Sequence, residues 1–469
     1  MDTRTPRQWF RSVFKSPDSV LTRRYAVSGL LSPLQLLVGG YAFVTICGAL
    51  LLACPLSTST GQWQPFLDAL FVATSGISTS GLSVVDVGSY YSVFGQIVLM
   101  TIFQVGGIGY MVFVVSMFRV LNMKIPLHTR IVAKESLASE GYHQIGRFFL
   151  SVFLYTALFE LAGMLFLSLL WREKYGFSKA LYMGLFHSVS TFCTAGFALF
   201  PDNLMRYRDS VGVNLVVNVI SLAGGIGFFV MNDLCGFLSD WVKNVRPRRL
   251  CLHTKMVFGV SAFVIALGTV IILLAEPWPM EWGLFRRVQT ASFQAISAST
   301  TDGFNTVDIG ALGTTSLLVL MALMFIGASP GSTGGGIKTT TLGSLFVFMR
   351  MQMKGPGRAV SFNREIPLKI LHKSIEIFMW FVMILAIDLV WLGWTEKATF
   401  IQIMFEIISA LGNTGLSMGI TSGLSAPGKW VLIVTMFIGR VGPATLSASV
   451  WEKEEIPVYR YAREELFIG

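Results

Sequence analysis

Long apolar runs separated by short polar segments dominate the hydropathy pattern of this chain. Crossing the roughly 30 Å hydrocarbon core of a bilayer takes about 20 residues of helix. Eight runs approach or exceed that length: 33–54, 91–118, 148–171, 211–237, 255–275, 312–328, 370–394 and 427–450. The pattern predicts an all-α membrane protein with eight transmembrane helices.

One polar motif recurs four times between these runs. It has the form F-x3-S-x3-[TN]-x-G-[LF] and reads FVATSGISTSGL, FHSVSTFCTAGF, FQAISASTTDGF and FEIISALGNTGL. Its glycines recur at a near-constant spacing, at Gly81, Gly196, Gly303 and Gly415. A second similar stretch follows each glycine at nearly the same distance, in QVGGIGYMVF, LAGGIGFFVM, FIGASPGSTGGG and FIGRVGPATL. Self-similarity at a near-constant period indicates internal repeats.

Each repeat is predicted to contain one span, a short re-entrant helix of about ten residues, a glycine turn and a second span. The four repeats cover 33–118, 145–241, 255–350 and 370–450, and the segments 1–32 and 451–469 flank them. Irregular backbone at membrane depth must be buried in protein or face a water-filled cavity. Four such turns most economically share one cavity around a pseudo-fourfold axis.

The glycine turns are candidates for a cation filter. Glycine lets backbone carbonyls turn inward without a Cβ clash, and a ring of carbonyls can replace the water shell of a cation. Each short helix would also direct its partially negative C-terminus at the ion. The candidate filter residues are Thr79, Ser80, Gly81, Thr194, Ala195, Gly196, Thr301, Asp302, Gly303, Asn413, Thr414 and Gly415. The alternative, close packing of small residues, is favoured for the GGIG sequences at 106–109 and 224–227.

The sixth apolar run ends in SPGSTGGGIKTTT, residues 329–341, which no continuous lipid-facing helix would hold. We expect a flexible intramembrane gate loop below the third filter segment, held by few, weak contacts. The candidate gate residues are Ser329, Pro330, Gly331, Ser332, Thr333, Gly334, Gly335, Gly336, Lys338 and Arg440. A phosphate-binding P-loop is rejected, because Ile337 interrupts its pattern and no strand precedes it.

Arg440 occupies the equivalent place in the last repeat, within FIGRVGP. A buried arginine is costly unless it is solvated or paired. We expect it to line the cavity below the filter and bond to carbonyls of the gate loop or to an acid. The alternative is a purely structural ion pair with Glu406 or Asp388. Lys338 is expected to end the loop near the cytoplasm, and the alternative is that its side chain snorkels to the interface.

Composition and charge support a membrane protein and indicate its orientation. Hydrophobic residues make up 53% of the chain and charged residues only 13%, against about 25% in soluble domains. If the spans alternate, one side carries 25 Lys and Arg residues and the other 9. Because basic loops mark the cytoplasmic face, both termini are predicted to be cytoplasmic. This segregation explains the net charge of +10 better than a nucleic-acid partner does.

Three carboxylates lie shortly after filter glycines: Asp86, Asp202 and Asp308. At the outer mouth they would concentrate cations; the alternative is that they cap solvated loops. The five histidines and five cysteines are scattered without metal-ligand spacing. No nucleophile–His–acid set is recognisable, so no enzyme is predicted.

The four filter glycines, QVGGIGYMVF and GASPGSTGGGIKTTT resemble the Trk/Ktr/HKT superfamily of potassium transporters over about residues 30–469. The short segment before the first span and the C-terminal RYAREELFIG resemble the Ktr-type membrane subunit. The resemblance implies four M1–P–M2 units, K⁺ transport across the cell membrane and a homodimer. It also implies a cytosolic nucleotide-binding regulator of the RCK/KTN type, so that a nucleotide would act only through the partner. Na⁺ dependence stays open.

The leading function is therefore K⁺ uptake down the electrochemical gradient. A second hypothesis is the pore subunit of a potassium pump complex driven by a separate ATPase, although relatives of that kind carry more than eight spans. A membrane enzyme or receptor would need a catalytic cluster or a soluble domain, and the polar segments are too short for one.

Overall fold

A computed structural model describes residues 33–109, 145–245, 249–355 and 357–442. The predicted terminal segments 1–32 and 451–469 lie outside these residues. So do the predicted ends of the first and last repeats, 110–118 and 443–450. In the described part, helices dominate and the only strands form a two-residue hairpin, β1 (Val360–Ser361) and β2 (Arg364–Glu365).

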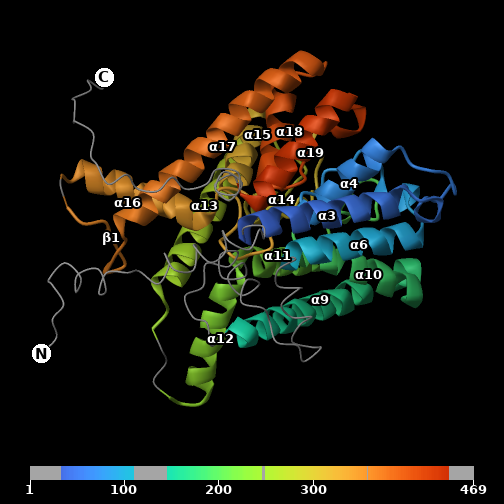
Figure 1. Ribbon diagram of the computed structural model, residues 1–469. Helices are drawn as coiled ribbons and strands as arrows, with labels where there is room; N and C mark the ends of the chain where they lie inside the picture. Colours follow the sequence, from blue (N-terminus) through green and yellow to red (C-terminus); the bar gives the residue numbers. More distant parts are fainter. Residues whose placement is uncertain (1–32, 110–144, 246–248, 356, 443–469) are drawn as a thin grey trace, which may run out of the picture.

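The helices form four similar groups along the chain (Figure 1). Each group opens with a long helix: α3 (Pro33–Ala53), α9 (Ile145–Tyr175), α13 (Leu252–Ala275) and α17 (Leu368–Thr395). A shorter helix then ends at the polar motif: α4 (Phe66–Ser78), α10 (Phe177–Phe192), α14 (Leu284–Thr300) and α18 (Phe400–Gly412). A third helix completes the group: α6 (Val93–Ile108), α11 (Val211–Ile226), α15 (Thr314–Ile326) and α19 (Ala426–Val441). The second group adds α12 (Phe228–Val242) and the third adds α16 (Thr339–Met353).

The four groups pack in a cycle. Within each group the three helices contact one another, and each short helix also packs on the third helix of the preceding group. Thus α10 packs on α6, α14 on α11, α18 on α15 and α4 on α19. The last of these contacts joins the fourth group to the first. The motif phenylalanines anchor this arrangement, because Phe71, Phe186, Phe293 and Phe405 are all buried.

One predicted span is interrupted. By length and apolarity, the described residues hold three helices that can cross a membrane, within α9, α13 and α17, or four if α11 and α12 count as one bent pair. The expectation of a single span over 211–237 is wrong, since α11 and α12 meet at 101°. Gly227 lies at this bend with φ of 97°, a backbone conformation that glycine adopts without strain. α12 accordingly runs away from the bundle (Figure 1).

The short helices are longer than the expected ten residues, at 13, 16, 17 and 13. At 1.5 Å per residue, none reaches the roughly 30 Å of a bilayer core. The GGIG sequences serve close packing, as predicted. A Cβ atom on Gly106 would clash with the Ile77 carbonyl, and one on Gly224 with the Phe192 carbonyl. The third helix of each of these groups therefore contacts the C-terminal turn of its short helix.

Candidate functional site

The four motif copies end in the same backbone conformation. The residue two before each motif glycine, at the C-terminal end of each short helix, is left-handed, with φ of 56°, 51°, 58° and 52° at Thr79, Thr194, Thr301 and Asn413. The N–H of the next residue bonds to the carbonyl of the motif serine at 2.7 to 2.9 Å in every copy. The glycine that follows also has positive φ: 83° at Gly81, 66° at Gly196, 83° at Gly303 and 92° at Gly415. The chain thus leaves each short helix through one repeated turn.

These turns meet one another in a closed ring. A Cβ atom on any of the four glycines would lie within 3.0 Å of a carbonyl oxygen in the next copy. The pairs are Gly81 with Ala195, Gly196 with Asp302, Gly303 with Thr414, and Gly415 with Ser80. Because the order returns to the first copy, the candidate filter residues converge on one place although they are far apart along the chain.

Asp302 is the one acid in the ring. It is 1% exposed, and neither carboxylate oxygen has a hydrogen-bond partner of good geometry among the described residues. Its backbone carbonyl, not its carboxylate, is the group that lies next to Gly196.

The predicted gate residues other than Arg440 lie between α15 and α16 and directly contact the filter turns. The Thr79 hydroxyl donates to the Thr333 carbonyl (3.1 Å), and the Thr194 hydroxyl donates to the Thr333 hydroxyl (3.3 Å). The N–H of Gly335 donates to the Thr301 hydroxyl (3.0 Å). A Cβ on Gly335 would also clash with the Gly412 carbonyl, just before the fourth turn. The loop therefore touches all four motif copies.

The expectation that few, weak contacts hold this loop is wrong. Ser329 donates to the Gly225 carbonyl (3.0 Å), Thr333 to the Gly224 carbonyl (3.2 Å), and Phe228 to the Gly331 carbonyl (2.9 Å), all from backbone N–H groups. The loop is thereby bonded to the bend between α11 and α12. Its glycines do not leave it loose; they allow its backbone to approach other backbones.

Arg440 links the loop to the first filter turn and to α6. Its guanidinium donates to the Thr333 carbonyl, to the Thr79 hydroxyl (3.1 Å), and to the carbonyls of Gly106 and Gly107, the latter at 3.3 Å. The predicted bond between Arg440 and a gate-loop carbonyl is thus present. Charge-assisted donors of this kind form stronger hydrogen bonds than neutral ones.

The ion-pair alternative for Arg440 is wrong. Glu406 accepts from the hydroxyls of Ser417 and Thr421, and Asp388 accepts from the Thr435 hydroxyl (2.7 Å). Both acids therefore bond to neutral hydroxyls among the described residues.

Lys338 does not extend toward the interface. Its Nζ donates to the carbonyls of Gly334 (2.6 Å) and Gly335 (3.1 Å), so it closes the gate loop on itself.

The three acids proposed for the outer mouth serve local contacts. Asp86 and Asp308 cap α5 (Val87–Tyr90) and η3 (Ile309–Ala311), each accepting from the backbone N–H two residues on. Asp202 forms an ion pair with Arg206 at 2.5 Å. Partial burial raises the pKa of Asp202, but hydrogen bonds from Arg206 outweigh it and hold the pKa below its usual value. For Asp86 and Asp308, the loop-cap alternative is confirmed.

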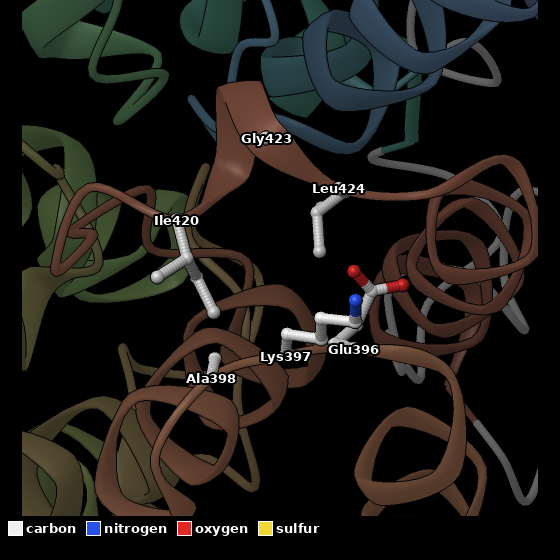
Figure 2. Close-up of a pocket in the computed structure, with 6 residues that line it drawn as sticks. All are labelled: Glu396, Lys397, Ala398, Ile420, Gly423 and Leu424. Carbon is white, nitrogen blue, oxygen red and sulfur yellow. The ribbon is translucent and has the colours of Figure 1, made fainter.

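A pocket of about 210 Å³ lies apart from the ring (Figure 2). Glu396, Lys397 and Ala398, which follow α17, line one side, and Ile420, Gly423 and Leu424, around η4 (Thr421–Gly423), line the other. Its carboxylate is already engaged, since the Ser425 hydroxyl and N–H donate to Glu396. The pocket contains none of the predicted site residues.

Sequence reasoning missed three polar side chains, Glu160, His187 and Gln294, and considered Glu406 only as a partner for Arg440. Glu160 of α9 accepts from the Gln104 amide of α6 at 2.8 Å. His187, Gln294 and Glu406 each follow a motif phenylalanine and are buried. The signal for this second set was available: three of four motif copies carry a polar residue at the same place in an apolar helix.

Long apolar helices around a ring of backbone carbonyls are typical of a membrane protein that transports cations. Sequence comparison agrees with this class. The chain belongs to the TrkH cation transport protein family, whose family model matches residues 45–456. The family consists of transporters rather than enzymes.

Two curated relatives support this membership, and one solved structure shares the fold. It is 37% identical over 442 residues to the Ktr system potassium uptake protein B of Bacillus subtilis, covering 93% of this chain and 97% of that protein. It is 32% identical over 448 residues to the potassium/sodium uptake protein NtpJ of Enterococcus hirae, covering 94% and 98%. The crystal structure of the potassium transporter TrkH from Vibrio parahaemolyticus has the same fold, with a TM-score of 0.70, 19% identity and coverage of 91% and 86%.

Proposed function

We propose that this chain takes up K⁺ across the cytoplasmic membrane through a filter formed by the four glycine turns. The observation that carries the proposal is the closed ring of Gly81, Gly196, Gly303 and Gly415, each next to a carbonyl of the following copy. Backbone carbonyls at the C-terminal ends of four short helices suit a desolvated monovalent cation. The relatives of similar sequence are described as potassium uptake proteins.

The proposed architecture is four M1–P–M2 repeats with eight transmembrane helices around a pseudo-fourfold pore. The cyclic packing of the helix groups favours it. The interrupted third helices fit it too, because irregular backbone at membrane depth is tolerated where it lines a cavity. The excess of basic residues on one side, 25 against 9, supports two cytoplasmic termini.

The loop within residues 329–341 is the proposed gate. It lies against all four filter turns, so an ion leaving the ring on that side would meet it. Opening must break its bonds to Thr79, Thr194 and Thr301, and Arg440 holds the closed position through Thr333.

Partners and coupling ions follow from the relatives. The name of the Bacillus subtilis protein places it in a system, which favours a cytosolic RCK/KTN-type subunit that carries the regulatory nucleotide, acting on a homodimer of this chain. The name of the Enterococcus hirae protein includes sodium, so Na⁺ is the second ion to test. The pump-subunit alternative is less favoured, because these relatives are described as uptake proteins over nearly their whole length.

Uptake by a K⁺-transport-deficient strain that expresses the chain tests the filter. Gly303→Ser would place a side chain against the Thr414 carbonyl, and we expect K⁺/Na⁺ discrimination to fall about tenfold or more, a change of about 1.4 kcal/mol or more in relative affinity. Gly419→Ser is the matched control: Gly419 has φ of 89°, but no described atom lies within 4 Å of an added Cβ. Equal discrimination in wild type and Gly303→Ser would remove the filter assignment.

A further inference from the structure

The residue that follows each motif phenylalanine occupies the same position in its short helix. In the four copies it is Val72, His187, Gln294 and Glu406, and all four are buried. Burying a polar side chain costs free energy unless it is hydrogen-bonded. The three polar members therefore need partners inside the protein, and their partners share one feature.

The polar members bond to the residues that follow the filter glycine of their own copy. His187 Nε2 accepts from the N–H of Leu199 (3.2 Å), and Gln294 Nε2 donates to the Thr306 hydroxyl (3.0 Å); both partners are the third residue after the glycine. Glu406 accepts from the hydroxyl of Ser417, the second residue after the glycine. Side chains of three different types thus bond from the same helix position to the segment after the filter.

The His187 ring is fixed on both sides. Since Nε2 accepts from Leu199, the proton lies on Nδ1, which is 2.7 Å from the Met183 carbonyl and donates to it. The His187 imidazole thus links α10 to the segment after the second filter turn.

Glu406 makes the most contacts of the three. Its carboxylate accepts from the hydroxyls of Ser417 and Thr421, with Thr421 at 3.1 and 3.2 Å from its two oxygens. The segment after the fourth filter turn is therefore bonded to its short helix at two residues.

The first copy lacks this contact. Val72 and its counterpart Val84 are both apolar. The motif serines follow the same trend. Ser297 donates to the Phe304 carbonyl (2.6 Å) and Ser409 accepts from Gly415 (3.0 Å), but the hydroxyls of Ser75 and Ser190 have no partner within the described part of the chain. The number of side-chain hydrogen bonds between the short helix and the segment after the filter therefore increases from the first copy to the fourth.

We propose that His187, Gln294 and Glu406 are positioning residues that hold the segments after three of the four filter turns and thereby set ion discrimination. This inference rests on the proposed filter. Binding sites need their contacting atoms held within about 0.5 Å by supporting groups. Carbonyls beside a segment that lacks these bonds can adjust to an ion of another size. The three bonded segments therefore supply the discrimination, and the segment after Gly81 is the one that can adjust.

Substitutions at position 406 test this proposal with a graded readout. In Glu406→Leu the hydroxyls of Ser417 and Thr421 lose their acceptor, and we expect the ratio of K⁺ to Na⁺ affinity in uptake to fall about tenfold, about 1.4 kcal/mol by the usual conversion. Glu406→Gln keeps an acceptor oxygen without the charge and should stay within about twofold of wild type. If the ratio of K⁺ to Na⁺ affinity fell as far in Glu406→Gln as in Glu406→Leu, the effect would come from the charge, and the proposal would be overturned.

Val72→Ala is the control for a merely structural effect. It removes buried volume at the same place in the first copy, so it should lower thermal stability and leave the ion ratio unchanged. If Glu406→Leu is not recovered from membranes, Gln294→Leu replaces it, since it removes one hydrogen bond. An unchanged ratio in the tested leucine variant, or an equal change in Val72→Ala, would overturn the proposal. An unchanged ratio in Gly303→Ser would instead remove the filter itself.

Discussion

Thr333→Val is the substitution that tests the gate most cleanly. The two side chains have nearly the same shape, but valine lacks the hydroxyl that donates to the Phe192 carbonyl (3.0 Å) and accepts from Thr194 (3.3 Å). A net hydrogen bond is worth about 0.5–1.5 kcal/mol, so the loss of two should cost the closed position about 1–3 kcal/mol. At about 1.4 kcal/mol per tenfold, the ratio of open to closed loops rises roughly 5- to 140-fold.

K⁺ flux into proteoliposomes at saturating K⁺ measures this change directly. We expect the maximum flux of Thr333→Val to rise and the K⁺/Na⁺ ratio to stay at the wild-type value, because the filter backbone is untouched. Ser332→Ala is the matched control. Among the described residues, the Ser332 hydroxyl bonds only within the loop, to the Ser329 carbonyl and the Gly334 N–H. Equal flux in wild type, Thr333→Val and Ser332→Ala would refute the idea that these bonds keep a gate closed.

Three further predictions follow from the same picture. Arg440→Ala should raise K⁺ flux, because the Thr333 carbonyl loses a charged donor; reduced expression with unchanged flux per molecule would mean that Arg440 is structural. Cysteines introduced at positions 20, 130, 245 and 360 should react only with a cytoplasmic thiol reagent and those at 88 and 310 only with an external one, and one reversed site would contradict the proposed topology. Deleting 460–469 should weaken co-purification with a regulatory subunit or the dimer itself, whereas full regulation without this tail would count against the Ktr-type assignment.

The ring was predictable because its signals are local. A Thr or Asn stands two residues before each glycine, at or just after the helix cap, and Thr79, Thr194, Thr301 and Asn413 all have the left-handed conformation. Four copies of one local turn then had to meet, since each carries irregular backbone that cannot face lipid.

The contacts of the gate loop were not predictable, because they are distant in sequence. Thr333 bonds to Thr194, 139 residues away, and to Thr79, 254 residues away. Glycine content suggested mobility, but glycine also allows backbones to approach closely, and here Gly224 and Gly225 accept hydrogen bonds from the loop. The same ambiguity explains the bend at Gly227, where an unbroken apolar run hid a change of direction.

The central claim is that a cation binds on the axis of the four glycine turns. Anomalous scattering from crystals of the protein grown in Rb⁺, a K⁺ substitute, tests it most directly. The account predicts Rb⁺ peaks inside the ring bounded by the carbonyls of Ser80, Ala195, Asp302 and Thr414. If the ring selects K⁺ over Na⁺, crystals grown in Na⁺ without Rb⁺ or K⁺ should show no such peaks. Rb⁺ bound only elsewhere, with an unoccupied ring, would contradict the account.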